Sequence, residues 1–299
     1  MLFSAATPCF GFGRRTAALL GLIPLAMLAA WGGLAAGLPE PPKPAAPAAP
    51  AAAKDRLLVF SKTAGFRHDS IPDGIACVRE LLGERYEIDA TEDAAAFTPS
   101  NLARYKAVIF LSTTGDILDA EQQKAFEGFI HLGGGFAGIH AAADTEHTWP
   151  WYGKLVGAYF KTHPNIQEAL VRVEDRTHPS TVMLPENWRR TDEWYVYKSN
   201  PRGQVKVLAN LDTKTIQGET MGEDHPIAWF HDFEGGRAWY TGGGHTKESF
   251  SEPLFRAHIK GGVLWAAGAE TAPVPAREAG KPADSSAQPP SPPAEKPAR

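Results

Sequence analysis

Cysteine is scarce in this sequence, with two residues, Cys9 and Cys77, among 299. Cys9 precedes an apolar N-terminal run and Cys77 lies in an apolar helical pattern, so neither a disulfide framework nor a cysteine-based metal motif is predicted. Positive charge is also limited, because the formal net charge is -4 and the basic residues form no arm or stripe. These absences exclude small disulfide-stapled folds and argue against nucleic acid as a partner.

The two ends of the chain differ in composition from its middle. Arg14 and Arg15 precede an uncharged apolar run that ends in small residues, so residues 1–37 predict either a signal peptide or an uncleaved membrane anchor. Either alternative predicts export to the periplasm or the cell exterior, with membrane contact only through an anchor. Residues 38–55 predict a Pro/Ala-rich linker, and residues 269–299 predict a disordered tail of similar composition.

The remaining residues, 56–268, predict one α/β domain. Apolar runs and one alternating stretch indicate strands at 56–61, 86–91, 106–111 and 136–139. Helices are expected between them, one opened by Pro72 and one capped by Asp119, followed by a further helix over 149–160. The second half has a more β-like pattern and ends in a helix, with expected elements at 169–173, 205–210, 227–231, 237–241 and 252–267. Alternating strands and helices predict a mostly parallel central sheet covered on both faces.

Polar side chains cluster in the loops that follow three of the expected strands, at 62–70, 112–116 and 140–149. In a parallel sheet these loops lie at one edge, where ligands bind. The loops carry Arg67, His68, Thr114, Asp116, His140, Asp144 and Trp149. A later strand also ends in a glycine-flanked histidine, His245, and Asp192 and Glu193 are expected in a polar loop.

Several motifs together resemble the trehalose-utilisation (ThuA-like) family of the class I glutamine-amidotransferase-like superfamily. They are SKTAGFRHDSI (61–71), LSTTGD (111–116), GGGFAGIHAAADTEHTWPWYGKLVGAYF (133–160), HPNIQ (163–167), DEWY (192–195), DHPIAW (224–229) and YTGGGHT (240–246). The resemblance implies a flavodoxin-like three-layer α/β sandwich and a role in the use of carbohydrates, particularly disaccharides.

The resemblance also argues against amidotransferase activity. The related amidotransferases place a nucleophilic cysteine at a strand-to-helix elbow and pair it with a later histidine. Here the elbow position corresponds to His140, next to Ala141, and His245 is similar to the partner histidine. A thioester requires the sulfur, which neither histidine nor alanine supplies.

The first hypothesis is acid/base chemistry on a sugar hydroxyl, an acetal or a carbon beside a carbonyl. Its predicted catalytic residues are His140, His245, Asp144 and Glu193. The expected partner is a small-molecule carbohydrate, either a disaccharide or a keto sugar. Its predicted binding residues are Arg67, His68, Thr114, Asp116, Trp149 and His163, with Trp151 and Tyr195 as further stacking candidates.

Two alternatives remain open at the level of the sequence. A divalent metal would find ligand types in His68, His140, His163, His245 and Asp144, although no two of them have the spacing of a known metal motif. With such an ion the chain would be a metal-dependent hydrolase. The other alternative is a non-catalytic carbohydrate-binding or accessory module, which fits an enzyme fold that has no cysteine at its elbow. The sequence assigns no cofactor.

Overall fold

The computed structural model describes residues 53–269 of the chain. The predicted signal peptide or anchor, most of the predicted linker and the predicted tail beyond residue 269 lie outside the described residues. Within residues 53–269, no helix combines the length and the hydrophobicity needed to cross a lipid bilayer. The described chain enters its first strand at Asp55 and leaves its last helix at Ala266.

A nine-stranded sheet with the strand order β2-β1-β3-β4-β11-β10-β9-β6-β7 is the centre of the fold. Its strands are β1 (Asp55–Phe60), β2 (Tyr86–Thr91), β3 (Tyr105–Leu111), β4 (Gly135–Ile139), β6 (Gln167–Val173), β7 (Asn187–Asp192), β9 (Lys206–Leu211), β10 (Pro226–Phe233) and β11 (Gly236–Thr241). A small second sheet pairs β5 (Phe160–Thr162) with β8 (Val196–Tyr197).

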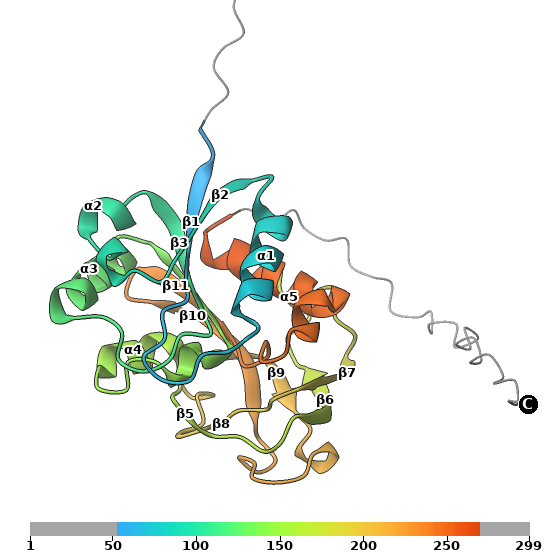
Figure 1. Cartoon of the computed structure of the whole chain (residues 1–299). Helices are drawn as coiled ribbons and strands as arrows, with labels where there is room; N and C mark the ends of the chain where they lie inside the picture. The colour runs from blue at the N-terminus through green and yellow to red at the C-terminus, as the bar shows by residue number, and fades with distance from the viewer. Residues whose placement is uncertain (1–52, 270–299) are drawn as a thin grey trace, which may run out of the picture. The chain divides into compact units, whose positions relative to one another are not determined.

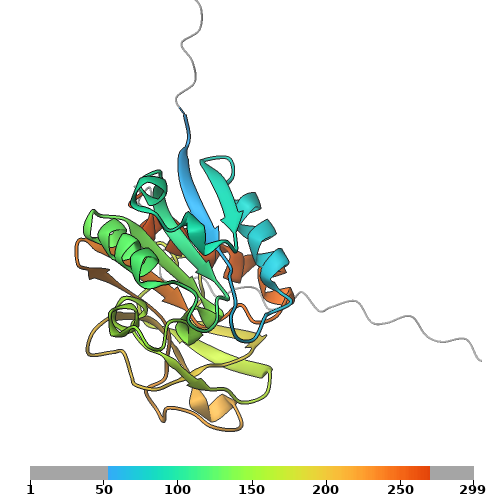
Figure 2. The same ribbon diagram turned by 60° about the vertical axis from the view of Figure 1, so that its left-hand side comes forward.

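The strands β2, β1, β3, β4 and β11 run parallel to one another. In β1, β3 and β4 the apolar runs are buried almost without interruption, as expected for strands covered on both faces. The helices α1 (Ile71–Leu82) and α5 (Pro253–Ala266) cover one face of the sheet. The opposite face carries α2 (Pro99–Leu102), α3 (Ala120–His131) and α4 (Pro150–Val156), as Figures 1 and 2 show. The predicted flavodoxin-like α/β sandwich is confirmed.

The other half of the sheet is antiparallel, because β10, β9, β6 and β7 each pair antiparallel with their neighbour. This arrangement fits the β-like pattern of the second half of the sequence. It brings the end of β7 to the same region as the carboxyl ends of β4 and β11, which is decisive for the site described below.

Two predicted elements differ from the structure. The helix expected over 149–160 is shorter, since α4 ends at Val156 and is followed by Gly157 with φ +95°. A left-handed residue ends an α-helix, and the chain then turns into β5. The loop expected around Asp192 and Glu193 is wrong for Asp192, which is the last residue of the strand β7.

Candidate functional site

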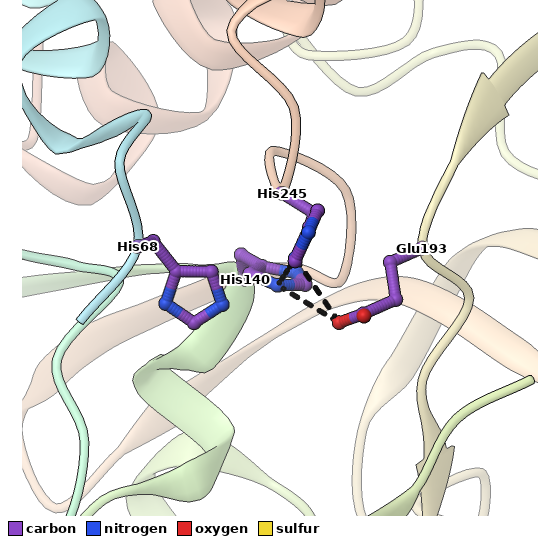
Figure 3. A group of neighbouring side chains, drawn as sticks. All are labelled: His68, His140, Glu193 and His245. Carbon is purple, nitrogen blue, oxygen red and sulfur yellow. Dashed lines mark hydrogen bonds and ion pairs between the residues drawn. The ribbon is translucent and has the colours of Figure 1, made fainter. Parts of the chain in front are cut away.

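Four side chains from separate parts of the sequence meet at one edge of the sheet. His68 lies in the loop after β1, His140 directly follows β4, and His245 follows β11. Glu193 directly follows β7, in the antiparallel half of the sheet. One ring nitrogen from each histidine and one carboxylate oxygen of Glu193 lie within 4.8 Å of one another (Figure 3). We call this group the histidine cluster.

Three polar atoms of the histidine cluster, two ring nitrogens and one carboxylate oxygen, are in direct contact. His140 Nε2 lies 3.2 Å from His245 Nδ1 and 3.5 Å from Glu193 Oε2. His245 Nδ1 lies 3.2 Å from the same Glu193 oxygen. The three atoms therefore form a nearly equilateral triangle, and the predicted catalytic residues His140, His245 and Glu193 lie together.

The ring of His140 is fully buried and held in one orientation. Its Nδ1 lies 2.9 Å from the carbonyl oxygen of Gly242. A carbonyl can only accept a hydrogen bond, so Nδ1 donates, and Nε2 is the ring nitrogen that faces His245 and Glu193. His140 also has φ +52°, in the left-handed region that favours glycine. Such backbone strain at the end of a buried strand is typical of functional positions.

His68 is also buried, with 4% of its surface exposed, and its Nδ1 has no hydrogen-bond partner. Its ring contacts those of His140 and His245 edge to face, with centroid separations of 4.8 and 5.1 Å. Burial, together with the two neighbouring imidazoles, lowers the pKa of His68 to about 3. His68 is therefore a neutral ring with an unused polar atom.

The carboxylate of Glu193 links the histidines. Burial by itself would raise the pKa of this group, but its contacts with His140 and His245 outweigh burial and hold the pKa well below the usual range. The same contact with Glu193 raises the pKa of His245. The other oxygen of Glu193 lies 3.0 Å from His163 Nδ1. His163, a predicted binding residue, thus borders the cluster through Glu193.

A buried ion pair between Arg190 and Asp192 holds the backbone at two residues of the cluster, Glu193 and His245. Arg190 Nη1 donates to Asp192 Oδ2 at 2.7 Å, and both side chains are almost completely buried. The carboxylate of Asp192 also accepts the backbone N–H groups of Glu193, Gly244 and His245 at 2.9, 2.8 and 3.1 Å. Gly244 has φ +111°, so this tight loop requires glycine. No role was predicted for Arg190, and the adjacent Asp192 and Glu193 were the signal in the sequence for this part of the site.

Asp144 lies outside the contact triangle. Its Oδ1 is 2.8 Å from His147 Nε2, and the other ring nitrogen of His147 contacts Lys198 Nζ at 3.0 Å. The catalytic role predicted for Asp144 stays a prediction, with His147 as its direct partner. Glu193 occupies the carboxylate position beside His140.

The other predicted binding residues are engaged in structural contacts. Arg67 forms an exposed ion pair with Glu92, with a shortest distance of 2.7 Å. Thr114 Oγ1 is buried and donates to the carbonyl of Phe66 at 2.9 Å. Asp116 accepts the hydroxyl of Thr148 at 2.9 Å. These residues hold the loops next to the cluster.

The predicted stacking residues separate into two groups. Trp149 and Trp151 stack on each other at 4.9 Å, and their indole nitrogens donate to Glu127 and Glu234 on the α3 side of the sheet. Tyr195 instead lies beside the cluster, with its ring centroid 4.3 Å from that of His140.

Phe66 is an aromatic residue near the cluster that the sequence did not single out. Its side chain is 67% exposed, and its ring lies 4.8 Å from that of His68. The exposed ring is therefore accessible to a ligand at the margin of the cluster. Its position next to Arg67 and His68 in a polar loop was the signal in the sequence.

Neither the buried cysteine nor a wide groove elsewhere on the domain is part of the cluster. Cys77 is buried in α1, and burial raises its pKa to about 11, so it is an inert core thiol. A groove of about 990 Å³ is lined by Leu102, Phe129 and Leu132, among others, and includes the start of β3. It lies at the opposite edge of the sheet and shares no lining residue with the cluster.

Comparison with known proteins is consistent with this geometry. The sequence matches the family ThuA, described as trehalose utilisation, over residues 56–266. The chain belongs to the ThuA family. This membership links the ThuA domain to carbohydrate utilisation, and its histidine cluster lies within the matched residues.

Two solved structures show the same fold. A ThuA-like protein from Bacteroides uniformis has 25% sequence identity and a TM-score of 0.61, covering 74% of this chain and 95% of that one. A ThuA-like protein from Parabacteroides merdae has 20% identity and a TM-score of 0.61, covering 74% and 93%. No curated protein matches the sequence.

Proposed function

We propose that this chain is an enzyme of carbohydrate utilisation that carries out proton transfer on a disaccharide or an oxidised, keto form of one. The observation that carries the proposal is the contact triangle of His140, His245 and Glu193. Its two ring nitrogens and its carboxylate oxygen lie 3.2–3.5 Å apart. Family membership supports the substrate class.

The geometry fits acid/base chemistry at a sugar oxygen or at a carbon beside a carbonyl. His140 has a fixed tautomer because its Nδ1 donates to Gly242, so its Nε2 can accept a proton. His245 is 21% exposed on its side chain and is held against Glu193, which stabilises its protonated form. A proton acceptor and a proton donor therefore lie side by side, as a transfer between two substrate atoms requires.

A sugar can approach the cluster from the side on which His245 and His163 are partly exposed. The His163 side chain is 43% exposed, and Phe66 projects beside His68. Sugars present apolar C–H faces that pack on aromatic rings, while their hydroxyls bond to polar groups. Phe66 supplies an exposed ring, and His163 supplies a polar contact at the margin of the cluster, whereas Tyr195 is buried between His140 and Phe160.

We also propose that the chain is exported. The support is the sequence of residues 1–37, in which two arginines precede an apolar run and small residues. Cell fractionation with an antibody against the ThuA domain tests this part separately, and recovery in the cytoplasmic fraction alone would contradict it.

Turnover measurements on the full-length chain test the catalytic proposal. Disaccharides and their keto forms are incubated with the protein, and products are identified by mass spectrometry. We expect turnover of at least one keto form, with kcat/KM reduced about 100-fold or more in His140→Ala, as is typical for loss of an acid/base group. His131→Ala is the matched control, because His131 also contacts a carboxylate, that of Glu234 at 2.6 Å, outside the cluster.

The non-catalytic alternative predicts a different result. A binding module would show a sugar-dependent rise in the melting temperature without product. Binding without turnover across the panel would overturn the enzymatic proposal and favour the accessory module.

A further inference from the structure

We propose that His68, His140, Glu193 and His245 bind one divalent transition-metal ion and leave a coordination position open for a sugar oxygen. The inference deepens the proposed function and rests on it for the identity of the substrate. The site itself is argued from the donor atoms alone.

The contact triangle has the dimensions of one face of a metal coordination sphere. Nitrogen and carboxylate oxygen ligands bind zinc at about 2.0–2.2 Å, which places neighbouring ligands of a tetrahedral ion about 3.3 Å apart. The three separations in the triangle are 3.2, 3.2 and 3.5 Å. An ion can therefore contact His140, His245 and Glu193 with little movement of their side chains.

His68 supplies a fourth donor within 4.8 Å of the others. Figure 3 shows the His68 ring on the loop after β1 with Nε2 on the side of the triangle and Nδ1, the buried atom without a hydrogen-bond partner, on the opposite side. His68 therefore offers Nε2 as the fourth ligand atom.

The outer contacts of the cluster are those that orient metal ligands. Metal-bound histidines usually donate their second ring nitrogen to a carbonyl or carboxylate. His140 does so to Gly242, and the second oxygen of Glu193 is engaged by His163. Asp192 fixes the backbone at Glu193 and His245. Each of these contacts restrains a ligand without occupying the atom that faces the centre.

The donor set favours a particular class of ion. Imidazole nitrogens suit zinc, iron, nickel and copper, whereas magnesium and calcium prefer oxygen ligands. The carboxylate of Glu193 supplies a negative charge that suits a dication. The partial exposure of His245 leaves room for a sugar oxygen as a fifth ligand beside the four protein ligands.

A bound ion changes the roles within the cluster. With an ion bound, His140 and His245 would serve as ligands rather than as the proton acceptor and donor, and the ion would supply Lewis acidity toward a sugar oxygen. His163, which borders the cluster on its exposed side, would accept the proton released by the polarised hydroxyl or by the carbon beside the polarised carbonyl. The substrate class remains that of the proposed function.

Metal analysis of the full-length chain tests the site. The protein is purified without chelator and analysed by inductively coupled plasma mass spectrometry. After removal of metal by dialysis, it is titrated with Zn²⁺, Mn²⁺ and Co²⁺, and Co²⁺ binding is followed by its visible absorption. We expect about one equivalent per chain, and affinity reduced about 100-fold or more in His140→Ala and Glu193→Gln. A smaller loss, about 10-fold, is expected in His163→Ala, which perturbs only an outer contact.

The controls separate the site from adventitious binding and from misfolding. His131→Ala retains full affinity, and Glu193→Gln preserves side-chain shape while removing the charge. Equal metal affinity in all variants, or no bound metal and no Co²⁺ absorption, would overturn the site. Sugar turnover by metal-free protein would also overturn it and leave the proposed function standing. Stoichiometric metal without turnover of any sugar would confirm the site and contradict only the function.

Discussion

At the residue scale, the most constrained side chain near the candidate site is Asp192. It is fully buried, and its carboxylate accepts hydrogen bonds from Arg190, Ser249 and three backbone N–H groups. Burial would raise its pKa, but the charge of Arg190 and these contacts lower it. Since all the neighbours are donors, no uncharged side chain can replace the carboxylate without leaving donors unpaired.

We therefore expect Asp192→Asn to destabilise the fold by about 3 kcal/mol or more, because it leaves the buried charge of Arg190 incompletely compensated. Urea denaturation followed by fluorescence measures the loss. The matched control is Glu168→Gln, which breaks the exposed ion pair with Arg189, and we expect it to leave the midpoint unchanged. Equal midpoints for both variants would show that the buried pair does not stabilise the loop.

At the scale of elements, one helical glycine determines how closely α5 approaches the sheet, whereas a glycine in α3 does not have this role. Gly262 lies in α5, and a Cβ at this position would lie 2.1 Å from a ring carbon of the buried Trp239. Gly128 lies in α3, and a Cβ there would have no heavy atom within 4 Å. The first glycine is required by packing, and the second is not.

The two positions give opposite predictions for the same substitution. Gly262→Ala should lower the free energy of unfolding by about 1–3 kcal/mol, since a side chain must be forced into a filled space. Gly128→Ala should raise it by about 0.5–1 kcal/mol, because alanine restricts the unfolded chain and favours helix. Denaturant titration of both variants is the measurement, and a shift of the same sign in both would refute the packing argument.

At the scale of the whole molecule, two buried histidines far from the histidine cluster link stability to pH. Burial lowers the pKa of His258 to about 3 and that of His178 to about 4. Both pack against aromatic side chains, including Trp239 for His258 and Phe230 for His178. Each ring is therefore neutral in the folded protein at neutral and mildly acidic pH.

The sign of the pH effect follows from these lowered values. Unfolded histidine has a pKa of about 6.5, so stability is fully present above that pH and is lost as the unfolded chain takes up protons below it. Each histidine should contribute about 1.4 kcal/mol per pH unit between about pH 6 and pH 4. We expect His258→Gln to reduce the slope of unfolding free energy against pH by that amount. His131→Gln is the matched control, and an unchanged slope in His258→Gln would contradict the prediction.

The sequence determined the parallel half of the fold because its signals are local. Continuous apolar runs in β1, β3 and β4 show burial on both faces, and Asp119 forms the capping box with Gln122 that starts α3. The same signals placed His68, His140 and His245 after strands. Because parallel strands share their carboxyl edge, their proximity could be expected before the structure was known.

Only the tertiary structure decided how the cluster is completed. The strand β7 was not predicted because its buried positions include Arg190 and Asp192, so the usual alternation of apolar and polar residues is absent. Its position beside β6 brings Glu193 to His140, whereas Asp144, closer in sequence, pairs with His147. Local patterns reveal which residues are buried, but the pairing order of strands and the compensation of a buried charge depend on contacts between distant parts of the chain.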